Sequence, residues 1–108
     1  MEMDLFSLRQ SLYPIVDELN LLNYHIDVVL LFGSRAKGTH STQSDYDLAF
    51  VSRDFGADRI AEGALLGHLL FRRVPNADAI PVSLFDFLSV QPVSPLIAEI
   101  KAHSITLI

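Results

Sequence analysis

Hydrophobic residues recur at intervals of three and four near the start of the chain, and this pattern predicts an amphipathic helix over residues 4–22. The residues that share this face are Leu5, Leu8, Leu12, Ile15, Leu19 and Leu22. Pro14 falls inside the pattern, and we expect it to kink or divide the helix because proline cannot donate the backbone hydrogen bond. A second helix is predicted from Asp58, a suitable N-cap residue, to about Arg73.

Short apolar runs between these patterns predict strands. Residues 26–32 and 46–52 are rich in β-branched and large apolar residues, and residues 79–87 form a third run. Between the first two strands, residues 33–44 are small and polar, which indicates a loop with at most one helical turn. Ser94 and Pro95 predict the start of a last helix that ends near His103, and the final ITLI predicts a short fourth strand.

The predicted order alternates helices and strands, which is typical of a layered α/β or α+β domain. With 108 residues, the chain has the length of a single domain, residues 1–108, with one core. The pattern leaves the direction of the strands open.

Composition excludes several classes of function. The chain has no cysteine, which excludes disulfides, cysteine–zinc sites and thiol catalysis. The formal net charge of -5 argues against stable binding of nucleic acid, because such proteins are usually basic. No signal peptide or membrane span is evident, so a cytoplasmic protein without membrane association is expected. Half of the residues are hydrophobic, which suggests apolar surface for a partner or for homo-oligomerisation.

Asp45 and Asp47 are the first candidate site. They stand two residues apart at the start of a predicted strand, so their side chains share one face. Carboxylates about 7 Å apart along a strand can together hold divalent cations. Mg²⁺, or alternatively Mn²⁺, suits such a pair together with substrate phosphates.

Gly33 and Ser34 are the second candidate site, because they follow directly on the first predicted strand. Glycine lets a ligand approach the backbone closely, and backbone N–H groups with a serine hydroxyl can bind phosphate oxygens. Arg35 and Lys37 add positive charge nearby. Either site alone is commonly a turn or a solvated strand end; together, on consecutive strands, they become specific.

The segment LFGSRAKGTHSTQSDYDLAF resembles the signature of the DNA polymerase beta nucleotidyltransferase superfamily. That signature is a hydrophobic residue, Gly-Ser, about ten residues and then Asp-hydrophobic-Asp-hydrophobic. Here ten residues separate Ser34 from Asp45. The chain is most similar to the short minimal nucleotidyltransferase (MNT) family, and the order of its elements and its ending PLIAEIKAHSITLI extend the resemblance.

The resemblance implies a nucleotidyltransferase fold with a small mixed sheet of about four strands flanked by helices. It implies that Gly33, Ser34, Arg35 and Lys37 bind a nucleoside triphosphate, with ATP the expected nucleotide, and that Asp45 and Asp47 are catalytic and hold Mg²⁺. A nucleoside monophosphate would then pass to a hydroxyl of a protein or small molecule, and pyrophosphate would leave. The resemblance also implies a HEPN-domain protein as a partner, with this chain as the antitoxin of a toxin–antitoxin pair.

The family carries a third carboxylate on the next strand, three residues before another aspartate. Aligning residues 82–87 with that pattern puts Ser83 at the catalytic position and Asp86 at the second aspartate, while Asp78 falls too early. Serine is a poor metal ligand and cannot act as a general base. The alternative interpretation is therefore a nucleotide-binding or interaction module with weak or no transferase activity.

Overall fold

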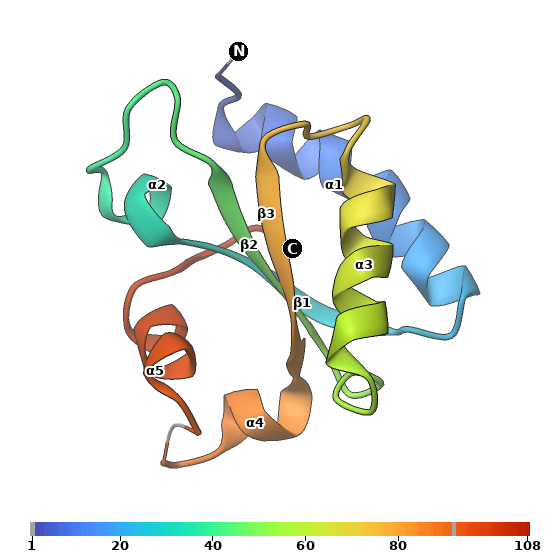
Figure 1. The fold of residues 1–108 in the computed structure, drawn as a ribbon. Helices are drawn as coiled ribbons and strands as arrows, with labels where there is room; N and C mark the ends of the chain where they lie inside the picture. Colours follow the sequence, from blue (N-terminus) through green and yellow to red (C-terminus); the bar gives the residue numbers. More distant parts are fainter. Residues whose placement is uncertain (1, 92) are drawn as a thin grey trace.

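A computed structural model describes residues 2–91 and 93–108, and within these residues it contains five helices and four strands. Their bounds are α1 Leu5–Leu21, β1 Ile26–Phe32, α2 Gly33–Lys37, β2 Tyr46–Ser52, α3 Arg59–Leu70, β3 Ala77–Ser83, α4 Leu84–Leu88, α5 Pro95–Ala102 and β4 Ile105–Thr106. Figure 1 shows the sheet at the centre, with helices on both sides.

The four strands form one mixed sheet in the order β3-β2-β1-β4. β1 pairs antiparallel with both β2 and β4, whereas β2 and β3 run parallel. A parallel pair needs a crossover connection, and α3 supplies it. The predicted mixed sheet of about four strands flanked by helices is confirmed.

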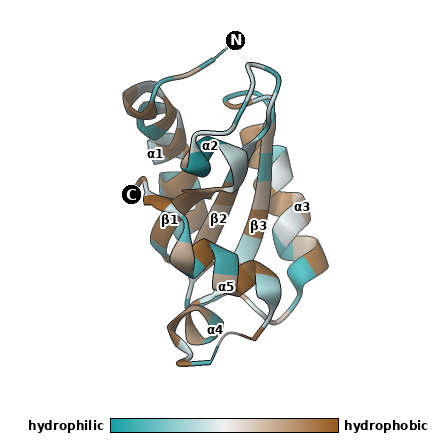
Figure 2. Ribbon diagram, turned by 90° about the vertical axis from the view of Figure 1, so that its left-hand side faces the viewer, coloured by the Kyte–Doolittle hydropathy of each residue, from teal (hydrophilic) through white to brown (hydrophobic). Residues whose placement is uncertain are grey.

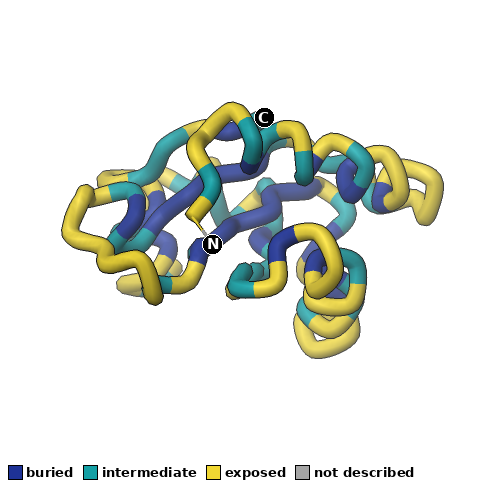
Figure 3. The backbone as a smooth tube through the Cα atoms, turned by 90° about the horizontal axis from the view of Figure 1, so that it is seen from above, coloured by how far each residue is buried: buried dark blue, intermediate teal, exposed yellow. Residues whose placement is uncertain are grey.

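Alternation along β2 separates two hydrophobic clusters, one on each face of the sheet. Tyr46, Leu48 and Phe50 point toward α1 and α3, and Ala49 and Val51 point toward α4 and α5. Figure 2 shows α5 and α4 in front of the strands, and Figure 3 shows the strands as the buried layer between the helices. Alternate side chains of β2 therefore pack in the larger core with α1 and α3 or face the smaller layer of α4 and α5.

Helix α1 is one continuous helix, so the expectation that Pro14 divides it is wrong. Proline removes a single helical hydrogen bond. The helix buries a stripe against the sheet on both sides of the proline, and this packing offsets the loss. The buried residues of the stripe are Leu8, Leu12, Ile15, Val16 and Leu19.

The third strand differs from its predicted bounds, because β3 covers residues 77–83 and not 79–87. The chain turns into the short helix α4 directly after Ser83, whose side chain accepts a hydrogen bond from the backbone of Asp86. Serine is a favoured N-cap residue, so the same apolar run that suggested a longer strand contains a helix start. This shift of the strand changes which residues reach the candidate site.

None of the helices within residues 2–91 and 93–108 has both the length and the apolar character that crossing a lipid bilayer requires.

Candidate functional site

Asp45 and Asp47 lie at the end of β2 that follows the polar loop, and they share the face of the sheet that α5 covers. Between them, Tyr46 points the other way and is 2% exposed in the larger core. Asp47 is half-buried and Asp45 is exposed. The alternation of a strand thus holds two carboxylates on one side by burying the residue between them on the other.

Asp78 brings a third carboxylate to the end of the sheet that holds Asp45 and Asp47. In the parallel pairing of β2 with β3, Asp78 stands directly beside Asp47, on a neighbouring strand about 5 Å away. Ser83 pairs with Ser52 at the opposite end of both strands. The alignment that put Ser83 at the third carboxylate position and Asp78 too early is therefore wrong. It failed because β3 begins earlier than its apolar pattern indicated.

The electrostatics of Asp47 reflect this crowding. Burial, followed by the nearby charges of Asp78, Asp45 and Glu99, raises the pKa of the Asp47 carboxyl above its ordinary value. A divalent cation would relieve the repulsion, because it favours the charged form of each carboxylate. A bound cation would therefore reduce the electrostatic repulsion among these carboxylates.

Gly33 lies against the same carboxylate. It follows β1 directly, and Phe32 pairs with Asp47 across the sheet. A side-chain carbon added to Gly33 would lie 2.1 Å from Oδ2 of Asp47, so the carboxylate or the backbone would have to shift. Gly33 also has a φ of 72°, in the left-handed region that favours glycine. Only glycine therefore leaves room for the Asp47 carboxylate beside this turn.

Ser34 and Lys37 belong to α2, the single short helix that follows Gly33. Ser34 is half-buried, and its carbonyl accepts the amide of Gly38, where a left-handed residue ends the helix. Lys37 is exposed, and its Nζ forms an ion pair with Oε1 of Glu99 on α5. The sequence did not point to Glu99, because a lone glutamate in a surface helix carries no motif.

Glu99 brings a fourth carboxylate to the site from a separate layer of the fold. The Lys37 ammonium lowers the pKa of Glu99, while the charge of Glu99 contributes to the raised pKa of Asp47. Lys37 and Glu99 therefore link α2 to α5 beside the aspartates.

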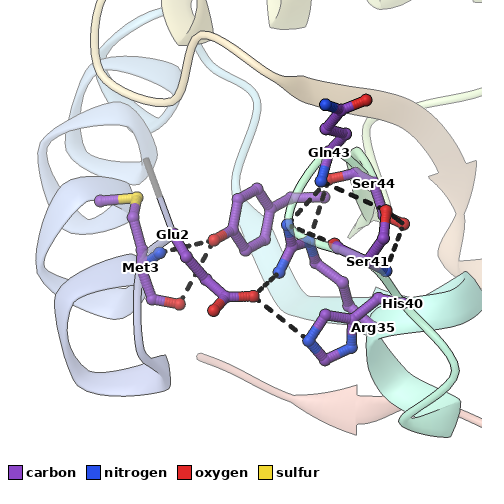
Figure 4. Close-up of polar contacts among 8 residues, drawn as sticks. Glu2, Met3, Arg35, His40, Ser41, Gln43 and Ser44 are labelled. Carbon is purple, nitrogen blue, oxygen red and sulfur yellow. Dashed lines mark hydrogen bonds and ion pairs between the residues drawn. The ribbon is translucent and has the colours of Figure 1, made fainter.

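Arg35 has surroundings other than those expected for a nucleotide-binding residue. Its side chain is 4% exposed, and its guanidinium donates to the carbonyl oxygen of Ser44 through Nε at 3.1 Å and through Nη2 at 2.9 Å. Nη1 forms an ion pair with Glu2 at 2.9 Å, and Figure 4 shows Arg35 between Glu2 and the loop that holds Ser41 and Ser44. The loop and Glu2 thus occupy this guanidinium.

The position of Arg35 also places it on the other face of the sheet. Its guanidinium carbon lies 4.0 Å from the centre of the Tyr46 ring, in a cation–π contact. The Tyr46 hydroxyl accepts the amide of Met3 at 2.6 Å. Arg35 therefore holds the loop that leads into Asp45, and it does so from behind the carboxylates.

The donor set suits a hard divalent cation. Asp45, Asp47 and Asp78 offer only carboxylate oxygens, and the absence of a side chain at Gly33 leaves room for the Asp47 carboxylate. Within residues 2–91 and 93–108, no group of three or more acidic, histidine or cysteine side chains is arranged to hold a metal ion by itself. Mg²⁺ needs no such cage, because it usually keeps waters and takes one or two carboxylates together with substrate phosphates.

The mixed four-stranded sheet with its flanking helices is a nucleotidyltransferase fold. The sequence profile described as "Polymerase beta, Nucleotidyltransferase" matches residues 17–108. The chain therefore belongs to the polymerase beta nucleotidyltransferase family, whose members typically use a divalent metal.

Three solved structures are similar to the chain in fold. A toxin–antitoxin crystal structure with AMP-PNP has a TM-score of 0.60 and 20% identity, over 98% of this chain and 73% of that chain. A mutant of the toxin–antitoxin pair MntA-HpeT has a TM-score of 0.58 and 18% identity, with the same coverage. A structure from Sulfolobus solfataricus named as a nucleotidyltransferase has a TM-score of 0.51 and 18% identity, over 94% and 80%. The comparison with curated proteins gave no match.

Proposed function

We propose that this chain binds a nucleoside triphosphate with Mg²⁺ and transfers the nucleoside monophosphate to a hydroxyl group. The observation that carries the proposal is the cluster of Asp45, Asp47 and Asp78 on one sheet face, directly beside Gly33. ATP is the proposed nucleotide, and one of the similar structures was solved with AMP-PNP.

Each part of the site has a role in this reaction. The turn at Gly33 and Ser34 receives the triphosphate, and Lys37 neutralises part of its charge. Asp45 and Asp47 would hold Mg²⁺, which would neutralise charge on the phosphates. The acceptor oxygen forms a bond to the α-phosphorus while the bond to the bridging oxygen breaks, and pyrophosphate leaves with that electron pair. Asp78 would take the proton of the acceptor hydroxyl.

The register of β3 supports an enzyme over an inactive binding module. The reason for the inactive alternative was a serine in place of the third carboxylate, and Ser83 lies at the other end of the strand. A proton acceptor at the site contributes about 10²- to 10⁴-fold in rate. With Asp78 in place, that contribution is available to this chain.

A protein partner is the second part of the proposal. Two of the similar structures are toxin–antitoxin pairs, and the chain exposes several large apolar side chains on α4 and in the segment around the start of α5. These are Phe85, Leu88, Val90, Val93 and Leu96. We propose a HEPN-domain protein as the partner and the role of antitoxin for this chain, with self-association as the competing use of the same surface.

The central test measures binding and transfer separately. The wild-type chain is titrated with AMP-PNP, with and without Mg²⁺, and is then incubated with each α-labelled nucleoside triphosphate and a candidate HEPN protein. We expect Mg²⁺-dependent binding and label on the acceptor, and we expect both to be lost in Asp45→Asn and Asp47→Asn.

Asp17→Asn is the matched control, because Asp17 is an exposed aspartate on α1, away from the site. It should behave as the wild type does. Absence of Mg²⁺-dependent AMP-PNP binding in the wild type would refute the proposal, and binding without transfer would support the inactive module.

A further inference from the structure

The segment before α1, residues 2–4, reaches the loop that leads into Asp45. Oε1 of Glu2 forms an ion pair with Nη1 of Arg35 at 2.9 Å, and Figure 4 shows Arg35 between Glu2 and this loop. The same guanidinium donates to the carbonyl oxygen of Ser44, the residue directly before Asp45. Arg35 therefore joins Glu2 to the backbone beside the first aspartate of the site.

The same segment also holds the residue that follows Asp45. The amide of Met3 donates to the Tyr46 hydroxyl at 2.6 Å, and that hydroxyl donates to the carbonyl oxygen of Met3 at 3.3 Å. Tyr46 is 2% exposed, so its ring is held firmly within the larger core. Residues 2–3 thus hold the backbone on both sides of Asp45.

Arg35 depends on the charge of Glu2. The Arg35 side chain is 4% exposed, and arginine stays protonated in proteins, so its positive charge lies permanently inside the fold. Across the described ranges 2–91 and 93–108, Glu2 is the one carboxylate in ion-pair contact with Arg35. Without that carboxylate the guanidinium would turn toward water, because an unpaired buried charge is costly. It would then no longer hold the carbonyl oxygen of Ser44.

The Glu2 carboxylate is itself held by polar contacts. The hydrogen bond from Arg35 lowers the pKa of Glu2 against an opposing effect of desolvation, and the charges of Arg35 and His40 lower it further. Nε2 of His40, in the same loop, lies 3.3 Å from Oε1 of Glu2. A hollow of about 570 Å³ adjoins Glu2, with Arg35 and His40 among its lining. The position of Glu2 therefore depends on these contacts and not on dense packing.

We propose that Glu2 is a positioning residue of the metal site, and that it acts through Arg35 to fix the backbone of Asp45 for a divalent cation. The inference rests on the proposed function, because it assumes that Asp45 holds the cation. A ligand carried by a loop with several conformations binds more weakly, since the apparent Kd rises as the competent fraction falls. Glu2 and Arg35 keep this fraction high without touching the cation or the nucleotide.

The first experiment measures metal binding apart from catalysis. The full chain without nucleotide is titrated with Mn²⁺, and free Mn²⁺ is measured by electron paramagnetic resonance. We expect Glu2→Gln to raise the Kd of Mn²⁺ about tenfold, because fewer molecules hold Asp45 in place. At saturating Mn²⁺ the Kd of AMP-PNP should stay within about twofold, because the bound cation then orders the loop. A wild-type Kd for Mn²⁺ in Glu2→Gln would overturn the proposal.

Asp4→Asn is the matched control for this titration. It removes one negative charge from the same exposed segment, and asparagine still caps α1, so the contacts of Arg35 are unchanged. We expect its Kd for Mn²⁺ to match that of the wild type. An equal rise in both variants would overturn the proposal, because the loss of charge alone would then explain it.

The second experiment follows the loop without any metal. Nε of Arg35 donates to the carbonyl oxygen of Ser44 at 3.1 Å, so its proton should exchange slowly with water and give a resolved NMR signal in the wild type. We expect this proton to exchange faster in Glu2→Gln, while the amide protons of α1 exchange as in the wild type. Unchanged exchange of the Arg35 proton in Glu2→Gln would overturn the proposal.

The last experiment tests whether Glu2 acts through Arg35. Arg35→Lys keeps the charge but loses the planar fork that contacts Glu2 and Ser44 together. If both residues act through one contact, adding Glu2→Gln to Arg35→Lys raises the Kd of Mn²⁺ no further, whereas independent effects would multiply and overturn the proposal. Failure of the wild type to bind Mn²⁺ would refute the proposed function as well, whereas equal binding by the wild type and Glu2→Gln counts against this inference alone.

Discussion

Gly33 and Asp47 occupy adjoining space, and this contact joins the two halves of the sequence signature. The ten residues between Ser34 and Asp45 let the chain leave β1 and return as β2, so that the glycine meets the second aspartate. The sequence alone suggested that the glycine makes room for a ligand. The structure shows that it first makes room for a carboxylate.

Replacing Gly33 by alanine tests this contact. We expect Gly33→Ala to displace the Asp47 carboxylate and to abolish Mg²⁺-dependent AMP-PNP binding, in addition to a backbone cost of about 1–3 kcal/mol. Gly38→Ala is the control, because Gly38 has a similar φ of 77° and no atom within 4 Å of the added carbon. Calorimetry should show the backbone cost in both variants, with nucleotide binding lost only in Gly33→Ala. Normal binding by Gly33→Ala would refute the steric argument.

Asp78 and Ser83 provide a second comparison at the scale of single residues. We expect Asp78→Asn to lower kcat by about 10²- to 10⁴-fold while AMP-PNP still binds, because the proton acceptor is lost. Ser83→Ala should keep its kcat and lose about 0.5–2 kcal/mol of stability, because it removes the cap of α4. Assays of nucleotidyl transfer measure the change in kcat, and thermal unfolding measures the change in stability. A large loss of kcat in Ser83→Ala alone would restore the alignment that the register contradicts.

At the scale of elements, the sequence predicted most helices and strands but misplaced the functional end of β3. Strong periodicity fixed α1, and the Ser94-Pro95 pair fixed the start of α5. The apolar run after residue 79 did not distinguish strand from helix, since α4 continues the same hydrophobic character. Asp78 was therefore read as lying outside the strand, and Glu99 could not be found because its role depends on how α5 packs.

The ion pair between α2 and α5 leads to a prediction at this scale. We expect Glu99→Gln to tighten AMP-PNP binding by about threefold to tenfold, because the change frees Lys37 and removes a negative charge near the phosphates. Lys37→Ala should weaken binding by about tenfold or more, as the loss of a charge-assisted contact would. Isothermal titration measures both constants.

The control for this pair is Glu18→Gln, which removes an exposed glutamate on α1 away from the site. Its affinity for AMP-PNP should match that of the wild type. If Glu99→Gln weakened nucleotide binding, Glu99 would be a ligand of the cation and not a competitor for Lys37.

At the scale of the whole molecule, the sheet separates stability from chemistry by face. The larger core lies with α1 and α3, and the carboxylates lie on the face that α4 and α5 cover. Arg35 is an exception in that it acts on the site from the core side, through the loop before Asp45. Sequence proximity to Gly33 suggested a nucleotide ligand, but the direction of a side chain depends on the turn of a five-residue helix and could not be inferred.

The raised pKa of Asp47 makes the stability of the whole domain depend on pH. The folded state holds the Asp47 proton to a higher pH than the unfolded chain does, so this group lowers stability as pH rises from about 3.8 through the raised pKa. We expect Asp47→Asn to remove this loss, so that the variant gains stability relative to the wild type as pH rises through this range. Denaturant unfolding at several pH values measures the difference. Saturating Mg²⁺ should reverse it, and a difference that stays constant across pH would contradict the prediction.

The alternation of β2 limits where insertions and deletions can occur in related sequences. Residues can be added to or removed from the loop before Asp45 without turning the strand over. One residue inserted between Tyr46 and Phe50 would exchange the two faces for one part of the strand relative to the other. Either core side chains would then face the site, or the carboxylates of Asp45 and Asp47 would face the core. Insertions and deletions should therefore accumulate in the loop and be absent from the strand, even where single substitutions in both are tolerated.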